Sequence, residues 1–131
     1  MSEPAIEVLE RLLEECDLTD KSEKVGETMY LLRWGSARVV AAASGEAVVV
    51  LAPLFEALPE KEPERFCRRL LELNSIMGGT AGFAISPDGS VVLQSGRGVK
   101  GLDADEFGLM LATVGKFADD FDDVLRDEFY A

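Results

Sequence analysis

Residues 63–130 have the sequence PERFCRRLLELNSIMGGTAGFAISPDGSVVLQSGRGVKGLDADEFGLMLATVGKFADDFDDVLRDEFY, and this stretch decides the fold. Its patterns predict a helix over Pro63–Met77, a break at Gly78 and Gly79, a β-hairpin, a glycine-rich connection and a long helix that begins at Asp103. The helices follow from apolar residues at helical spacing, and the hairpin follows from two alternating runs. The residues before Pro63 are expected to complete this unit.

The closing helix has a full set of start signals. Asp103 is the expected N-cap, Glu106 follows three residues later, and Leu102 can pack on Phe107 across the first turn. An apolar stripe then runs down the helix through Phe107, Met110, Leu111, Val114, Phe117, Phe121, Val124, Leu125 and Phe129. The opposite face carries aspartates, which we expect to be solvated rather than to hold a metal ion.

The hairpin precedes this helix. Ala81, Phe83 and Ile85 alternate with smaller residues, and a second alternating run begins at Val91. Between them lies Ser-Pro-Asp-Gly at residues 86–89, which has proline at the second position of a β-turn. These patterns predict two antiparallel strands.

Length and charge limit the possible functions. A chain of 131 residues fits one domain spanning residues 1–131, and roughly two thirds of the unfolded surface of such a chain becomes buried. Lys and Arg number 13 against 25 Asp and Glu, so the formal net charge is −12. This charge repels phosphate backbones and anionic lipid surfaces, and we therefore expect no nucleic-acid partner and no membrane partner.

Several kinds of active site lack their usual residues. The chain has no histidine, which removes the commonest general base and most zinc sites. Cys16 and Cys67 fall on predicted helices among apolar residues and are expected to be reduced, buried thiols. We therefore expect no catalytic residues, no metal and no cofactor. The chain also shows no secretory signal and no apolar run of membrane-spanning length, so a cytoplasmic location is expected.

The first half predicts a helix and three strands. Apolar spacing favours a helix over residues 2–16, a polar loop over 17–27, and strands over 28–34, 38–43 and 47–54. Short glycine-containing links join the strands, which indicates antiparallel hairpins. The predicted fold is therefore an α+β domain with the order α-β-β-β-α-β-β-α and an antiparallel sheet packed by helices.

These strands carry apolar side chains on both faces. Tyr30-Leu31-Leu32 and the run Val48–Leu51 lack the clean alternation of a sheet that has one face in water. The second face should therefore be covered by helices of this chain, by another subunit or by a bound partner.

The segment from Gly96 to Gly101 matches G-x-G-x-x-G. In a dinucleotide site such glycines let the backbone approach a pyrophosphate, and Arg97 and Lys100 would add positive charge. That motif needs a further parallel strand, which is missing here, and Asp103 places a carboxylate where the phosphate would lie. A flexible loop is the favoured interpretation, and a small nucleotide- or phosphate-binding enzyme is the less favoured alternative.

Several motifs resemble those of class I type III secretion chaperones of the CesT/SycE type. They are the segments Leu70–Asn74, Phe83–Gly89 and Val91–Gln94, and Gly101-Leu102-Asp103 leading into a helix. YbjN-like regulators share a similar pattern. The chaperone resemblance implies a non-enzymatic, acidic, cytoplasmic homodimer that binds the extended N-terminal segment of a secreted effector. The YbjN-like alternative implies a regulatory or interaction domain without a secretion client.

The chaperone resemblance also implies roles for individual residues. Its dimer contact would involve the second helix, at Leu70, Leu73, Ile76 and Met77. Its client contact would involve the first helix and the sheet, at Ile6, Leu9, Leu13, Leu31 and Val39.

Overall fold

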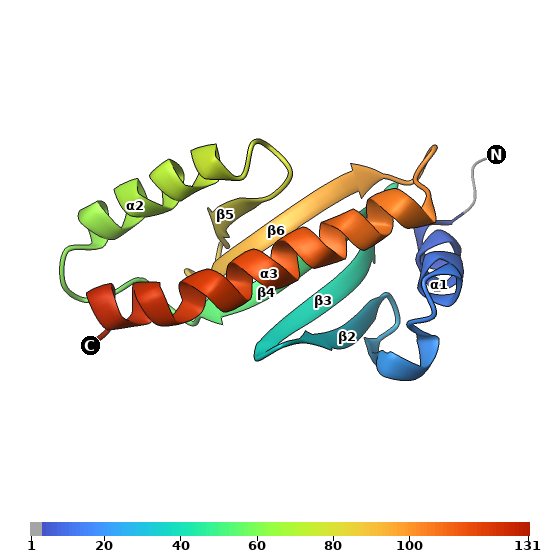
Figure 1. Ribbon diagram of the computed structural model, residues 1–131, viewed down its shortest axis with the longest axis horizontal. Helices are drawn as coiled ribbons and strands as arrows, with labels where there is room; N and C mark the ends of the chain where they lie inside the picture. Colours follow the sequence, from blue (N-terminus) through green and yellow to red (C-terminus); the bar gives the residue numbers. More distant parts are fainter. Residues whose placement is uncertain (1–3) are drawn as a thin grey trace.

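An antiparallel sheet with the strand order β1-β2-β3-β4-β6-β5 forms the centre of the computed structural model, which describes residues 4–131. The helices pack against it, so the predicted α+β class is confirmed (Figure 1). The strands are β1 (Glu23–Gly26), β2 (Met29–Trp34), β3 (Ala37–Ser44), β4 (Ala47–Phe55), β5 (Gly82–Ile85) and β6 (Val91–Gly98). The helices are α1 (Ala5–Glu15), α2 (Pro63–Ile76) and α3 (Ala104–Phe129), with a short 3-10 turn at Thr19–Lys21.

Helix α3 crosses one face of the sheet, and α1 packs on the same face near the start of α3 (Figure 1). The strands bury alternate residues beneath these two helices: Leu32, Val39, Ala41, Val48, Val50 and Ala52 are all at most 6% exposed. Helix α2 lies beside the edge strand β5 instead. One face of the sheet therefore belongs to the main core.

Helix α3 begins as its sequence predicts. The side chain of Asp103 accepts a hydrogen bond of 2.8 Å from the backbone N–H of Glu106, which satisfies one free donor of the first turn. Leu102 and Phe107 are both buried. The predicted apolar stripe is mostly buried, but Phe117 and Phe121 are only half-buried and Val124 is 49% exposed. The stripe is therefore wider than the part of the helix that contacts the core.

Two segments differ from the sequence prediction, and part of a third falls outside the described residues. The expected loop over residues 17–27 contains the 3-10 turn and strand β1, which pairs Lys24 with Tyr30. The expected glycine-rich loop is largely strand, because β6 continues to Gly98 and pairs with β4 as far as Ala47. Backbone pairing with β4 holds these glycines extended although they have no side chains to pack. The predicted helix start at residue 2 lies outside the described residues, and α1 begins at Ala5.

The turn between β2 and β3 is attached to the middle of α3. Trp34 lies so close to Gly115 that a Cβ atom on Gly115 would be 2.3 Å from Cγ of Trp34. Beside it, Asp119 accepts hydrogen bonds from both the backbone N–H and the hydroxyl of Ser36. The hairpin end is thus fixed against the helix by close packing and by hydrogen bonds.

Replacing Gly115 by alanine should destabilise the protein, because the new methyl group overlaps the first atoms of the Trp34 side chain. We expect a net loss of about 1–3 kcal/mol in the free energy of unfolding, which outweighs the gain in helix propensity. The measurement is urea unfolding followed by fluorescence of the single tryptophan. Gly108 is the matched control, since nothing lies within 4 Å of its added Cβ and Gly108→Ala should stabilise α3. Equal stabilisation by both substitutions would contradict this packing.

Candidate protein-binding surface

The direction of side chains on β2 identifies the two faces of the sheet. The hydroxyl of Tyr30 donates a hydrogen bond of 2.5 Å to Glu10 on α1, and Trp34 lies against Gly115 on α3. Even-numbered residues of β2 therefore point toward the helices. Because side chains alternate along a strand, Leu31 points toward the opposite face.

Strand register extends this opposite face across three strands. Leu31 pairs with Val40, which pairs with Leu51, and the next row runs from Met29 through Ala42 to Val49. We call the following apolar residues the open face: Met29, Leu31, Val40, Ala42, Val49, Leu51 and Pro53. All of them are half-buried or exposed, and none belongs to the buried core.

The open face is the second apolar face of the sheet, whose cover the sequence left undecided. Within residues 4–131, α1 and α3 cover the other face and α2 lies beside β5, so the chain's own helices leave the open face uncovered. Burial does alternate along β4, where half-buried and buried residues follow one another from Ala47 to Ala52. The uncovered residues are nevertheless apolar where a solvated face should be polar. A continuous apolar patch of this kind is typical of an interaction surface.

The predicted client-contact residues fall in different environments. Leu31 lies on the open face and is half-buried, and Ile6 is half-buried against the core. Leu9, Leu13 and Val39 are at most 2% exposed beneath the helices. Among these five, Leu31 therefore offers surface on the open face.

Sequence reasoning did not single out Val40, Val49 and Leu51. Their neighbours in sequence are equally apolar, as in Val39-Val40, so the pattern shows two apolar faces without showing which one a helix covers. The signal that could have found them is parity: once Val39 is placed in the core, Val40 must lie outside.

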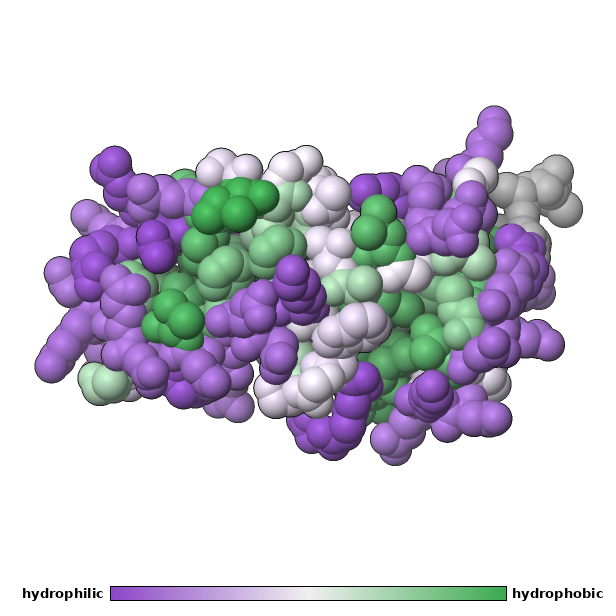
Figure 2. All heavy atoms as spheres, viewed as in Figure 1, coloured by the Kyte–Doolittle hydropathy of each residue, from purple (hydrophilic) through white to green (hydrophobic). Residues whose placement is uncertain are grey.

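The predicted dimer residues also divide between core and surface. Leu70, Leu73 and Met77 are at most 4% exposed within the monomer, whereas Ile76 is 66% exposed. Leu71, which was not singled out, is 69% exposed on the same helix. Figure 2 shows hydrophobic surface in the region of α2 and the C-terminal half of α3, between hydrophilic areas.

Asn74 on α2 closes part of the β5 edge. Its side-chain oxygen accepts a hydrogen bond of 2.7 Å from the backbone N–H of Phe83, and its side-chain nitrogen donates one of 3.4 Å to the carbonyl of Phe83. The amide group thus contacts both backbone groups that a neighbouring strand would use. Edge strands with free backbone groups tend to pair with other chains, and here α2 prevents that pairing at Phe83.

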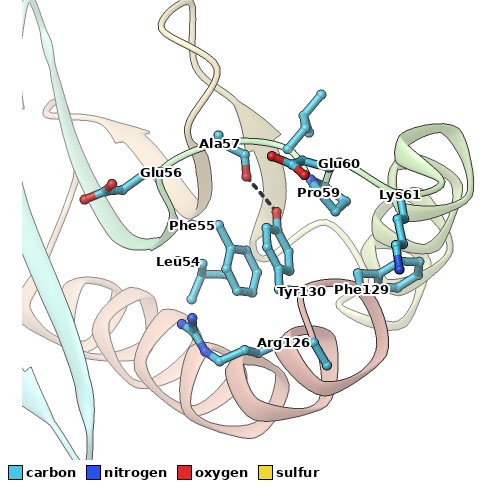
Figure 3. A pocket seen from close by; sticks show the side chains of 12 residues that line it. Leu54, Phe55, Glu56, Ala57, Pro59, Glu60, Lys61, Arg126, Phe129 and Tyr130 are labelled. Atoms are coloured by element: carbon cyan, nitrogen blue, oxygen red, sulfur yellow. Dashed lines mark hydrogen bonds between the residues drawn. The ribbon is translucent and has the colours of Figure 1, made fainter.

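A pocket of about 680 Å³ lies between the segment that follows β4 and the end of α3 (Figure 3). The rings of Phe55 and Tyr130 stack with centroids 4.2 Å apart, and the hydroxyl of Tyr130 donates a hydrogen bond of 2.7 Å to the carbonyl of Ala57. Burial raises the pKa of Tyr130 to about 12. The guanidinium of Arg126 lies over the Phe55 ring, 5.1 Å from its centroid. These contacts hold the end of α3 against the β4–α2 connection.

The glycine segment does not have the geometry of a phosphate loop. Gly96 and Gly98 lie in β6 opposite Val49 and Ala47, and only Gly101 has the left-handed φ of +79°. Arg97 donates a hydrogen bond to the carbonyl of Gly96. This backbone is therefore held in strand pairing and does not form the loop of free N–H groups that would bind a phosphate.

Cys16 and Cys67 are free and half-buried, and burial is the main cause that raises the pKa of Cys16. Residues 4–131 contain no group of three or more potential ligands placed to share a metal ion. No helix in this part of the chain combines the length and apolar character needed to cross a membrane.

The sequence profile of YbjN, described as a putative bacterial sensory transduction regulator, matches residues 5–127. The chain belongs to the YbjN family. No curated protein sequence matches this YbjN-family chain.

Several solved structures have a similar fold, and among them are chaperones in complex with other proteins. The ExsC–ExsE complex gives a TM-score of 0.68 at 20% identity, covering 94% of this chain and 97% of the other. The HopA1–SchA chaperone–effector complex gives 0.67 at 11% identity, covering 94% and 99%. The Yersinia pestis type III secretion chaperone SycH, in complex with a fragment of YscM2, gives 0.59 at 15% identity, covering 88% and 98%. This YbjN-family chain therefore shares its fold with a protein chain of each of these three complexes.

Replacing Asn74 by alanine should remove both hydrogen bonds to Phe83 and leave the β5 edge open. We expect a loss of about 1–3 kcal/mol in the free energy of unfolding, together with faster hydrogen exchange of the Phe83 amide. Ser75→Ala is the control, because that exposed hydroxyl only donates to the carbonyl of Glu72 within α2. Unchanged exchange at Phe83 in Asn74→Ala would show that the side chain does not protect this edge.

Proposed function

We propose that this protein is a non-enzymatic, chaperone-type binding protein whose single domain, residues 1–131, acts as a homodimer. Its client is the extended N-terminal segment of a secreted effector protein. The open face supports this function, because it is a patch of apolar side chains on a sheet that the chain's own helices leave uncovered. The fold shared with chaperones bound to effectors or other proteins adds support.

An extended segment suits the shape of the open face. Its alternate side chains can pack among the rows that run from Leu31 through Val40 to Leu51. Ordering a flexible segment costs roughly 2–5 kcal/mol or more of the contact energy, so a wide apolar surface is needed to offset that cost. The net charge of −12 would keep a protein with such a surface soluble.

The residues first assigned to the client take different roles in this proposal. Leu31 contacts the client directly, together with the rest of the open face. Ile6, Leu9, Leu13 and Val39 support the sheet from the helix side. Leu9, Leu13 and Val39 belong to the buried core, and Ile6 packs against it. Their substitution would therefore act on client binding through the shape of the sheet.

The homodimer forms through α2. Leu71 and Ile76 are the exposed apolar residues of this helix, and they lie on its outward side. Leu70, Leu73 and Met77 hold α2 against its own subunit from behind. A dimer contact at α2 leaves the open face of each subunit available, since the open face lies on β2, β3 and β4.

A second candidate is a regulator that binds a partner that is not secreted. The match to the YbjN family over residues 5–127 favours it. The same open face would serve, so the two functions differ in the partner and not in the binding surface.

The client can be identified by co-purification from the native cell under conditions that activate secretion, followed by limited proteolysis and mass spectrometry. We expect one protected segment from the N-terminal region of a secreted protein. Val49→Lys combined with Leu51→Lys should abolish its recovery, because two buried charges would face the client. Leu109→Lys is the control, since Leu109 is an exposed apolar residue on α3, 58% accessible and off the open face.

The outcomes separate the candidates. A protected segment from a partner that is not secreted would favour the regulator. Recovery of the free protein only, from cells that secrete actively, would contradict a client-binding function, as would equal recovery with the open-face variant and its control.

Replacing Leu71 and Ile76 together by glutamate should convert the dimer into a monomer, because four carboxylates would meet at the α2 contact. Sedimentation velocity measures the change, and Leu109→Glu serves as the control for an exposed apolar residue elsewhere. A dimer that persists in the α2 variant would place the subunit contact on another surface.

A further inference from the structure

Two arginines lie directly opposite each other on the uncovered side of the sheet. Arg33 of β2 pairs with Arg38 of β3 in the strand register. Arg33 has the same parity as Leu31, and Arg38 has the same parity as Val40, so both side chains point to the side of the open face. Both residues are exposed.

Neither arginine has a partner within residues 4–131, where no ion pair or hydrogen bond involves its side chain. Two other arginines form ion pairs across elements or within a helix: Arg65 lies 2.9 Å from Glu128, and Arg126 lies 2.9 Å from Asp122. Like charges directly opposite across two strands destabilise a sheet. In a chain with 25 acidic residues, an unpaired arginine pair therefore needs an explanation outside the folded subunit.

The arginine pair lies at one end of the open face. Arg33 lies two residues after Leu31 and Arg38 lies two residues before Val40, so the pair stands next to the β2–β3 turn. On the α3 side, Arg38 also borders a small hollow with Ala118 and Asp122, and the carboxylate of Asp122 pairs with Arg126 at 2.9 Å. The apolar rows of the open face therefore continue into the arginine pair on the same side of the sheet.

The opposite end of the same strands carries two glutamates. Glu27 lies in the turn before β2, and Glu46 lies in the turn between β3 and β4. Both are exposed. An acidic group on a bound segment would be attracted to the arginine end and repelled from the glutamate end.

We infer that Arg33 and Arg38 bind a carboxylate of the client, which is an extended segment with alternating apolar side chains and an Asp or Glu at the end over the β2–β3 turn. This inference rests on the proposed function and adds the chemistry of the segment. A carboxylate between two guanidinium groups relieves their repulsion and can accept several charge-assisted hydrogen bonds. The pair therefore sets which end of the segment lies over the β2–β3 turn.

The test uses two short synthetic peptides with alternating valine and serine, labelled with fluorescein. One ends in two aspartates and the other in two asparagines at the same positions. Fluorescence anisotropy with the intact protein at low salt should show the aspartate peptide binding about tenfold more tightly. The difference should shrink as salt is added, because exposed charges are screened.

Arg33→Gln combined with Arg38→Gln should remove the preference for aspartate while leaving the asparagine peptide bound as before. Arg69→Gln combined with Lys116→Gln is the matched control, because these exposed cations lie on α2 and α3, and it should keep the preference. Arg38→Gln should also raise the melting temperature by relieving the repulsion. A lower melting temperature would assign the pair a structural role and overturn the inference.

Other outcomes distinguish failure of the arginine–carboxylate contact from failure of the proposed client binding. Equal binding of both peptides, abolished by Val49→Lys with Leu51→Lys, would leave the open face as the client site and overturn the role of the arginines. Survival of the preference in the arginine variant would also overturn that role. Failure of both peptides to bind would count against the proposed function itself. A change of oligomeric state in the arginine variant would assign the pair to a contact between subunits and overturn the client role.

Discussion

The packing of α3 across one face of the sheet is the contact on which the rest of the structure depends. Phe107, Val114 and Leu125 of this helix are completely buried, and α1 fills the remaining part of the same layer. A sheet of this width has two faces, and the available helices are sufficient for one. The apolar residues of the other face are consequently left at the surface of this acidic domain.

The position of α2 follows from an aromatic cluster at the end of α3. Phe66 lies edge-on to Phe129 at 5.1 Å between ring centroids and to Tyr130 at 5.6 Å, and it also contacts Phe55. These contacts hold the start of α2 against the core, and Asn74 holds its far end against β5. The helix therefore protects an edge strand with one side and presents apolar residues with the other.

The exposed side of α3 and the open face also differ in how their charges are arranged. The exposed side of α3 is acidic, and the paired arginines of α2 and α3 are each balanced by a nearby carboxylate. At the β2–β3 turn, by contrast, two arginines share one end of an apolar surface, and no ion pair within residues 4–131 involves either side chain. An apolar surface with opposite charges at its two ends can favour one orientation of a bound chain, which apolar contacts by themselves cannot do.

Sequence determined the elements whose signals are local. The capped start of α3 at Asp103, the proline turn at residues 86–89 and the α+β class all follow from short-range patterns, as does the surplus of apolar residues in the strands. Tertiary structure decided which of those residues are buried. Val39 and Val40 are adjacent and chemically identical, yet Val39 lies under the helices and Val40 lies on the open face. Strand β1 and the extension of β6 to Gly98 likewise depend on pairing with another strand: β1 pairs with the neighbouring β2, and the end of β6 pairs with β4, about fifty residues earlier in the chain. The physical reason is that burial and strand pairing are properties of contacts between elements, and a residue's own side chain does not specify them.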